Sequence, residues 1–174
     1  MLDPFFTIDP GITGTGWAYF VPIADSAIDS VSFGNIVPRS TKTEDYIARS
    51  SEIVHELRYV VSTICKLTFN WPVFIEEPSY MGGAKQYVGQ TAAESGSLVK
   101  LVWHYGRIWQ ALSDRGHKIT PIPVNTWKGQ LPKNISHNRI KALADKHKLN
   151  GMSDSAKDHA LDAIGIGFHI LGIK

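Results

Sequence analysis

The order of strand-like and helical segments is the feature of this sequence that most constrains its fold. Three short runs rich in apolar and β-forming residues follow one another within residues 5–37, joined by short connections. From residue 43 onward, segments with helical spacing of apolar residues alternate with further short apolar runs. This order predicts an α/β fold, and 174 residues suit one domain spanning residues 1–174.

The individual elements follow from the spacing of apolar residues and from the residues that interrupt it. The predicted strands cover residues 5–8, 17–21, 31–37, 71–75 and 119–124, and the predicted helices cover residues 43–67, 98–115, 139–149 and 155–171. Pro121 and Pro123 cannot donate to a neighbouring strand, so the fifth strand is predicted to lie at an edge of the sheet. Residues 125–138 are polar and contain Gly129 and Pro132, which predicts a loop with at most one helical turn.

The net charge of +2 conceals an uneven distribution along the chain. Residues 1–114 carry 8 Lys and Arg against 12 Asp and Glu, whereas residues 115–174 carry 10 against 4. Clustered cations of this kind are typical of a surface that binds a polyanion, because they displace counterions from phosphates. A solvated, charged face without a partner is the alternative interpretation.

Composition and the lack of targeting segments indicate the cellular compartment. No apolar run approaches the roughly 18 residues of a membrane span, and the first residues lack the basic and apolar regions of a signal peptide. Cys65 is the only cysteine, which excludes an intrachain disulfide and a cysteine-based zinc site. These features predict a cytoplasmic protein with no membrane partner.

Acidic and imidazole side chains stand at positions that one topology would bring together. Asp9 ends the first predicted strand, and Glu76 ends the fourth. Asp158, His159 and Asp162 lie on the last predicted helix, where positions three and four apart share a face. Such a cluster is costly unless a cation neutralises it, and hard oxygen donors suit Mg²⁺ or Mn²⁺. Taken alone, each residue also has a structural interpretation, such as turn formation by Asp9 or capping by Asp158.

Three segments of the sequence resemble the motifs of RuvC-type Holliday junction resolvases. They are residues 8–18 with Asp-Pro-Gly and two further glycines, residues 74–78 with an acid after an apolar pair, and residues 158–163 with a His three positions before an Asp. The resemblance extends from residue 5 to about residue 170. It implies an RNase H-like fold, in which a five-stranded mixed sheet is flanked by helices on both faces.

The resemblance also implies an activity and a set of site residues. It implies a homodimer that binds a four-way DNA junction and makes paired symmetric nicks, leaving 5′-phosphate and 3′-hydroxyl ends. Carried over by motif, the catalytic residues and ligands of two Mg²⁺ ions, for which Mn²⁺ would substitute, are Asp9, Glu76, His159 and Asp162. Asp158 is an alternative fourth ligand. Glu77 is a departure from the family pattern, and strand alternation turns it away from Glu76.

Candidate DNA contacts lie in the basic region and in one glycine-rich loop. Phosphate contacts are expected from three cations between the fifth strand and the last helix, namely Lys128, Lys133 and Arg139. Tyr80 is a candidate for stacking on an unpaired base, and Lys85 in the same loop is a further candidate contact. The segments around Lys85 and residues 127–129 also resemble phage-borne members of the family, so the expected location is the cytosol of a bacterium or of a phage-infected host.

Three other functions share parts of this pattern. A less selective nuclease for branched DNA or RNA–DNA hybrids would have the same fold and metals. A non-catalytic DNA-binding module would keep the fold, but it would not need the full set of acids. The spacing of Asp9, Gly11 and Gly16 also resembles the phosphate loop of actin-like ATP-binding proteins. Those proteins need a second domain and a second loop, so no nucleotide cofactor is expected.

Overall fold

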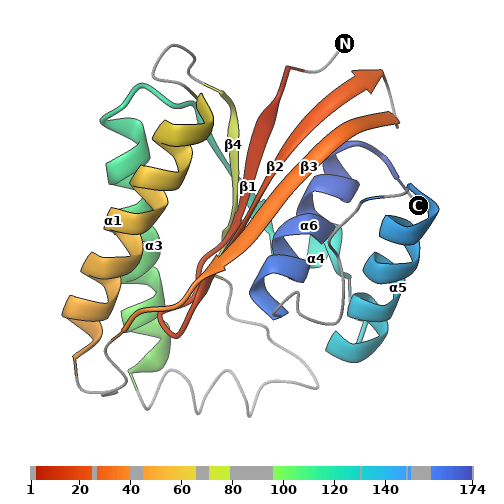
Figure 1. The fold of residues 1–174 in the computed structure, drawn as a ribbon. Helices are drawn as coiled ribbons and strands as arrows, with labels where there is room; N and C mark the ends of the chain where they lie inside the picture. The colour runs from red at the N-terminus through yellow and green to blue at the C-terminus, as the bar shows by residue number, and fades with distance from the viewer. Residues whose placement is uncertain are drawn as a thin grey trace.

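Five strands form one mixed sheet at the centre of the structure, a computed structural model that describes residues 3–24, 27–39, 45–65, 71–78, 96–129, 131–147, 149 and 158–173 (Figure 1). The strands are β1 (Phe5–Asp9), β2 (Thr15–Ala24), β3 (Ala27–Ile36), β4 (Val73–Glu77) and β5 (Ile119–Pro123). They lie in the order β3-β2-β1-β4-β5. Strands β1, β2 and β3 are antiparallel neighbours, whereas β4 pairs parallel to both β1 and β5. The predicted mixed sheet and the edge position of the fifth strand are confirmed.

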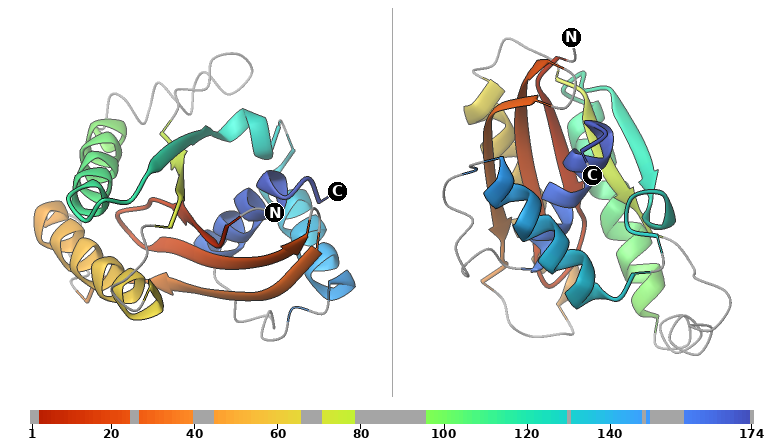
Figure 2. Two further views of the ribbon diagram at one scale, coloured as in Figure 1. Left: turned by 90° about the horizontal axis from the view of Figure 1, so that it is seen from above. Right: turned by 90° about the vertical axis from the view of Figure 1, so that its right-hand side faces the viewer.

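Helices cover both faces of this sheet (Figure 2). One face carries α1 (Tyr46–Cys65) and α3 (Ser97–Ser113), and the other carries α4 (Val124–Trp127), α5 (Lys133–Lys146) and α6 (Asp158–Ile170). Within the described ranges, no helix is both long and apolar enough to cross a membrane.

Strand β1 is the centre of the sheet, and its alternate residues supply two separate cores. Phe6 and Ile8 pack with Leu57 of α1 in one buried cluster, and Phe5 packs with Phe168 of α6 in the other. Because helices cover both of its faces, β1 is buried along its whole length, which explains its nearly continuous apolar sequence.

The carboxyl ends of two central strands lie at the lower edge of the sheet in Figure 1. Strands β1 and β4 run parallel and end at this edge, and α1, α3 and α6 begin near it. Open α/β sheets bind ligands at the carboxyl ends of their strands, and helix amino termini carry partial positive charge. The topology therefore gathers strand-end acids and three helix amino termini in one region.

The structure differs from the sequence expectations in the length of several elements. Strands β2 and β3 each contain 10 residues and are longer than the sequence predicted. The extent of β3 was underestimated because polar residues on its exposed side interrupt the apolar pattern. Helix α5 begins at Lys133, so the prediction of a loop through residue 138 was wrong after Pro132. Burial of Ser136, Ile140 and Ala144 on one side of α5 stabilises this earlier start.

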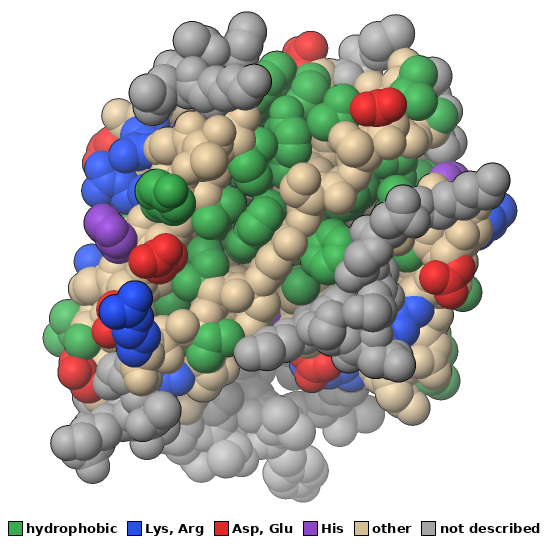
Figure 3. Space-filling model, in the orientation of Figure 1, with side chains coloured by type: hydrophobic (Ala, Val, Ile, Leu, Met, Phe, Trp, Pro, Cys, Tyr) green, Lys and Arg blue, Asp and Glu red, His purple; other side chains and the backbone are tan. Residues whose placement is uncertain are grey.

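An apolar surface lies beside α1, where β2 and β3 extend past that helix. Hydrophobic side chains gather there in the orientation of Figure 1, and charged side chains follow α1 (Figure 3). Trp17, Tyr19 and Ile36 pack against the core from this side and stay partly exposed. This surface is separate from the strand-end acids.

Candidate active site

Asp9 reaches the site because β1 alternates its side chains between two faces. Thr7 points toward α6, where its hydroxyl donates to the carbonyl oxygen of Ala163 over 2.7 Å. Asp9, two residues on, faces the same side and is only 6% exposed. The loop that follows is tied by Thr15, whose hydroxyl donates to the carbonyl oxygen of Gly11 over 3.0 Å.

The glycines after Asp9 let α6 approach this loop. A Cβ on Gly11 would lie 2.8 Å from Cε1 of His159, and a Cβ on Gly16 would overlap the backbone carbonyl of His159. Side chains at these two positions would therefore push the start of α6 away from β1. The spacing of glycines in the first motif serves this close packing.

Glu76 lies on β4, next to Asp9 across the parallel strand pair. The register pairs Ile8 with Ile75, which places the next residue of each strand at the same edge. Trp127 of α4 donates from Nε1 to Oε2 of Glu76 over 3.0 Å. Glu77 faces the opposite side and is exposed, as strand alternation predicts.

Helix α6 contributes His159 and Asp162, one turn apart on the face toward β1 and β2. Nδ1 of His159 lies 2.6 Å from Oδ2 of Asp9 and donates to it. Asp162 is 6% exposed, and its Oδ1 lies 2.9 Å from Nζ of Lys128 and 3.0 Å from Nε2 of His137. The four residues carried over by motif thus come from three distant segments to one place.

Asp158 has a different environment from its neighbour His159. Its side chain is 65% exposed and pairs with Nζ of Lys133 over 3.0 Å. The hydrogen bond from Lys133 is the main reason that the pKa of Asp158 is lowered. Nδ1 of His137 lies 3.6 Å from its other oxygen. The carboxylate of Asp158 is therefore engaged on the outer surface, while His159 points inward.

Burial and mutual repulsion dominate the electrostatics of the acids. Burial, followed by the charges of Asp9 and Asp162, raises the pKa of Glu76 to about 8 against the opposing effects of Lys128 and Trp127. Burial also raises the pKa of Asp9, and this outweighs its hydrogen bond from His159. That same hydrogen bond raises the pKa of His159. The crowded carboxyl groups therefore favour a bound cation.

The donor atoms of the site suit a divalent cation, although the side chains are not arranged to coordinate one common point. Three carboxyl groups and one imidazole line a single cavity, and oxygen-rich donor sets of this kind suit Mg²⁺. No group of three or more His, Cys, Asp and Glu side chains among the described residues is arranged to hold a metal ion. Asp162 instead turns to Lys128 and His137.

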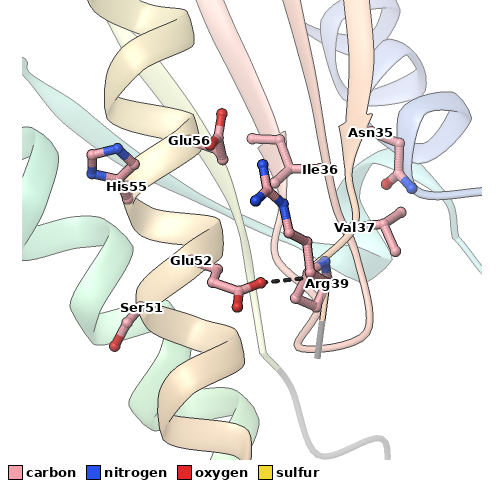
Figure 4. Close-up of a pocket in the computed structure, with 9 residues that line it drawn as sticks. Asn35, Ile36, Val37, Arg39, Ser51, Glu52, His55 and Glu56 are labelled. Carbon is pink, nitrogen blue, oxygen red and sulfur yellow. Dashed lines mark hydrogen bonds between the residues drawn. The ribbon is translucent and has the colours of Figure 1, made fainter. Parts of the chain in front are cut away.

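The cavity at this site has a volume of about 470 Å³ and is walled by the loop after β1 and by α1, α3 and α6. Its charged and imidazole lining consists of Asp9, Arg49, Glu76, Lys100, His159 and Asp162. A larger cavity of about 680 Å³ lies between α1 and the end of β3 (Figure 4). There the backbone N–H of Arg39 donates to Glu52 over 2.7 Å, and none of the predicted site residues lines it.

The candidate DNA contacts have different surroundings. The ammonium group of Lys128 faces Asp162 inside the site rather than the outer surface. Lys133 is bound to Asp158, and Arg139 is exposed on α5. Tyr80 and Lys85 lie outside the described residues.

Three residues of the site could not be recognised from the sequence as individual contributors. Trp127 holds Glu76, and His137 holds Asp162. Both lie in the segment that was expected to be a polar loop. The only signal in the sequence would have been an aromatic ring and an imidazole within an otherwise polar segment. The third residue is Arg49, which lines the cavity from α1 and has no motif around it.

The order of the strands, the helices on both faces and the strand-end acids define an α/β protein of the RNase H-like fold. No family model and no curated protein sequence matches this sequence. Among solved structures, it is similar to RuvC of Thermus thermophilus, with a TM-score of 0.63, 16% identity and coverage of 95% of this chain and 92% of that one. The structure of T. thermophilus RuvC in complex with Holliday junction substrate gives a TM-score of 0.58, 14% identity and coverage of 95% and 91%. The resemblance to RuvC seen in the motifs is thus confirmed at the level of the whole fold.

The raised pKa of Glu76 predicts a pH-dependent loss of stability in the metal-free protein. Between its usual pKa of 4.5 and its raised pKa of about 8, the native state keeps a proton that the unfolded chain has released. Stability therefore falls as pH rises through this range. Glu76→Gln should remove this component, so that its melting temperature exceeds that of the wild type by several degrees at pH 8 and matches it near pH 4.5.

Thermal unfolding of the metal-free proteins from pH 4 to 8.5 measures this difference. Millimolar Mg²⁺ should raise the melting temperature of the wild type at pH 8, because a ligand of the native state stabilises it. Parallel pH curves for the wild type and Glu76→Gln would show that Glu76 does not titrate in this range.

Proposed function

We propose that this protein is a metal-dependent endodeoxyribonuclease that resolves four-way DNA junctions by paired symmetric nicks. The convergence of Asp9, Glu76, His159 and Asp162 on one cavity is the observation that carries the proposal. The fold shared with T. thermophilus RuvC supports it, because one of those structures contains a Holliday junction substrate. Paired nicks need two sites, so the proposed active form is a homodimer.

The acids would hold the metal ions. Asp9, Glu76 and Asp162 would be the carboxylate ligands of two Mg²⁺ ions. When bound, such ions activate a water molecule, neutralise charge on the phosphate and stabilise the leaving oxygen. Binding also requires Glu76, whose pKa is raised to about 8, to lose its proton, and Asp162 to exchange its contacts with Lys128 and His137.

Asp9 and His159 would orient the site and accept one proton from the attacking water. Asp9 holds Nδ1 of His159, which leaves Nε2 available to ligate an ion or to accept a proton from the attacking water. Attack by the water oxygen forms a new P–O bond and breaks the bond between phosphorus and the 3′-oxygen. The products carry a 5′-phosphate and a 3′-hydroxyl, and the 3′-oxygen takes its proton from solvent.

Incubation with an end-labelled synthetic four-way junction tests this function directly. Mg²⁺ should permit symmetric nicks in opposite strands, and EDTA should prevent them. A linear duplex and an RNA–DNA hybrid of the same sequence, at the same salt concentration, are the controls. Equal cutting of these substrates would favour a nuclease without junction selectivity, and tight binding without any cutting would favour a DNA-binding module.

The exposed basic residues of α5 give a prediction about the DNA path. Arg139→Ala and Lys133→Ala should each weaken binding to junctions of any sequence. Each change should also reduce the slope of log affinity against log salt by about one, the value for one lost phosphate contact. Binding titrations at several salt concentrations measure the slope, with Lys146→Ala at the far end of α5 as the matched control. Unchanged slopes would move the DNA path away from this helix.

A further inference from the structure

Arg49 is a buried cation on the wall of the active-site cavity. It lies on α1, its residue is only 6% exposed, and its side chain lines the cavity that also contains Asp9 and Glu76. The Nε atom of Arg49 is buried and has no hydrogen-bond partner among the described residues. A polar group in this state costs free energy unless a partner satisfies it.

The protein itself does not supply that partner within the described ranges. The ion pairs of the site use Lys128, Lys133, His137 and His159, and none of them involves Arg49. Arg107 on α3 provides a contrast, because it donates to the hydroxyls of Ser50 and Ser51 and to the backbone of α1. Arg107 therefore joins the two helices, whereas Arg49 faces the cavity.

Further positive charge lies on the same side of the cavity. Lys100 of α3 lines it, with its ammonium group 5.3 Å from the ring centroid of Tyr46. Ser97, the first residue of α3, lines it as well, so the partial positive charge of this 17-residue helix is directed there. The cavity thus has an acidic wall from β1, β4 and α6 and a cationic wall from α1 and α3.

We propose that Arg49, Lys100 and the amino terminus of α3 form a subsite for a backbone phosphate next to the phosphate that is cut. This inference rests on the proposed nuclease function, because the acids and their metal ions would take the scissile phosphate. A guanidinium group suits a phosphate, since its N–H groups can bind two oxygens at once. Ile12 and Leu101 line the same cavity and provide apolar contacts for the sugar between the two phosphates.

Such a subsite would determine which phosphate reaches the acids. Phosphate contacts fix the register of a protein on DNA, and correct placement of the reacting bond supplies much of the rate of an enzyme. Arg49 would therefore be a substrate-binding residue whose loss shifts or slows cleavage without removing a metal ligand.

Single methylphosphonate substitutions in the junction test the subsite, because each removes the charge of one phosphate. For the wild type, one position beside the cut should lower the cleavage rate about 10- to 100-fold, the effect expected for a lost charged hydrogen bond. Arg49→Gln should show a similar loss on unmodified DNA and no further loss at that one position. Arg49→Lys should recover part of the rate, and Arg58→Gln, an exposed arginine on the same helix, should behave as the wild type.

Lys100→Met serves as a second variant, because the half-buried Lys100 can be replaced without opening the core. It should reduce the effect of the same methylphosphonate even if Arg49→Gln fails to fold. The inference is wrong if folded Arg49 and Lys100 variants keep the wild-type methylphosphonate profile while the wild type cuts normally. If the wild type cuts no junction with any metal ion, the proposed function itself is wrong.

Discussion

Asp9→Asn should reduce junction cleavage at least about a thousandfold and leave junction binding intact or tighter. Asp9 is buried, its carboxyl group contacts His159, and the strand register places it next to Glu76. An amide cannot supply the negative charge that the proposed Mg²⁺ ions would require. Its neutrality also lowers repulsion toward the phosphate, so affinity for DNA should not fall.

Asp162→Asn should have the same consequence, although its structural effect differs. Asp162 pairs with Lys128 and His137, so this change removes the negative charge that faces the ammonium group of Lys128 and leaves that cation beside the cavity unneutralised. We therefore expect tighter junction binding from Asp162→Asn than from Asp9→Asn. Single-turnover cleavage and gel-shift titration measure both properties, and Asp145→Asn on the exposed side of α5 is the control. Near wild-type cleavage by either variant would show that the metal ions bind elsewhere.

His159→Ala should lower the cleavage rate at least about a hundredfold, whereas Asp158→Asn should lower it about tenfold or less. The two residues are adjacent, but His159 points to Asp9 and lines the cavity. Asp158 pairs with Lys133 on the surface and can act only through its field. The comparison separates an imidazole in the site from an all-carboxylate site with its ligand one residue earlier.

The pH dependence of the rate adds a second measurement for His159. The hydrogen bond to Asp9 raises the pKa of His159, so its base form is gained as pH rises above the usual imidazole pKa of 6.5. If His159 accepts the proton of water, the rate should rise through this range, and His159→Ala should lose that limb of the profile. An essential Asp158 with a dispensable His159 would reverse the assignment.

Local sequence patterns were sufficient to predict much of the fold. The apolar run before Asp9 predicts a strand, because a fully covered central strand needs apolar residues on both faces. The spacing of Leu57 and Val61 predicts α1, and Pro121 and Pro123 predict the edge strand. The full extent of β3 and the start of α5 could not be predicted, because exposed polar residues carry little periodic signal when packing elsewhere stabilises the element.

The sequence by itself determined the types and order of the site residues. Strand ends at Asp9 and Glu76 and helical spacing between His159 and Asp162 are local properties, so their motifs can be recognised in the linear chain. The two-residue period of a strand likewise assigns Glu76 and Glu77 to opposite faces of β4, because it depends only on their positions in the chain.

Only the tertiary structure decided which of these groups are paired and which line the cavity. Lys128 in the basic segment faces Asp162, Lys133 binds Asp158, and Arg49 of α1 lies at the same cavity as the acids. These relations join residues far apart in the chain, and they depend on how closely α6 packs against the loop after β1. Charge and burial act through space, so composition alone could identify a basic region but not the buried arginine beside the acids.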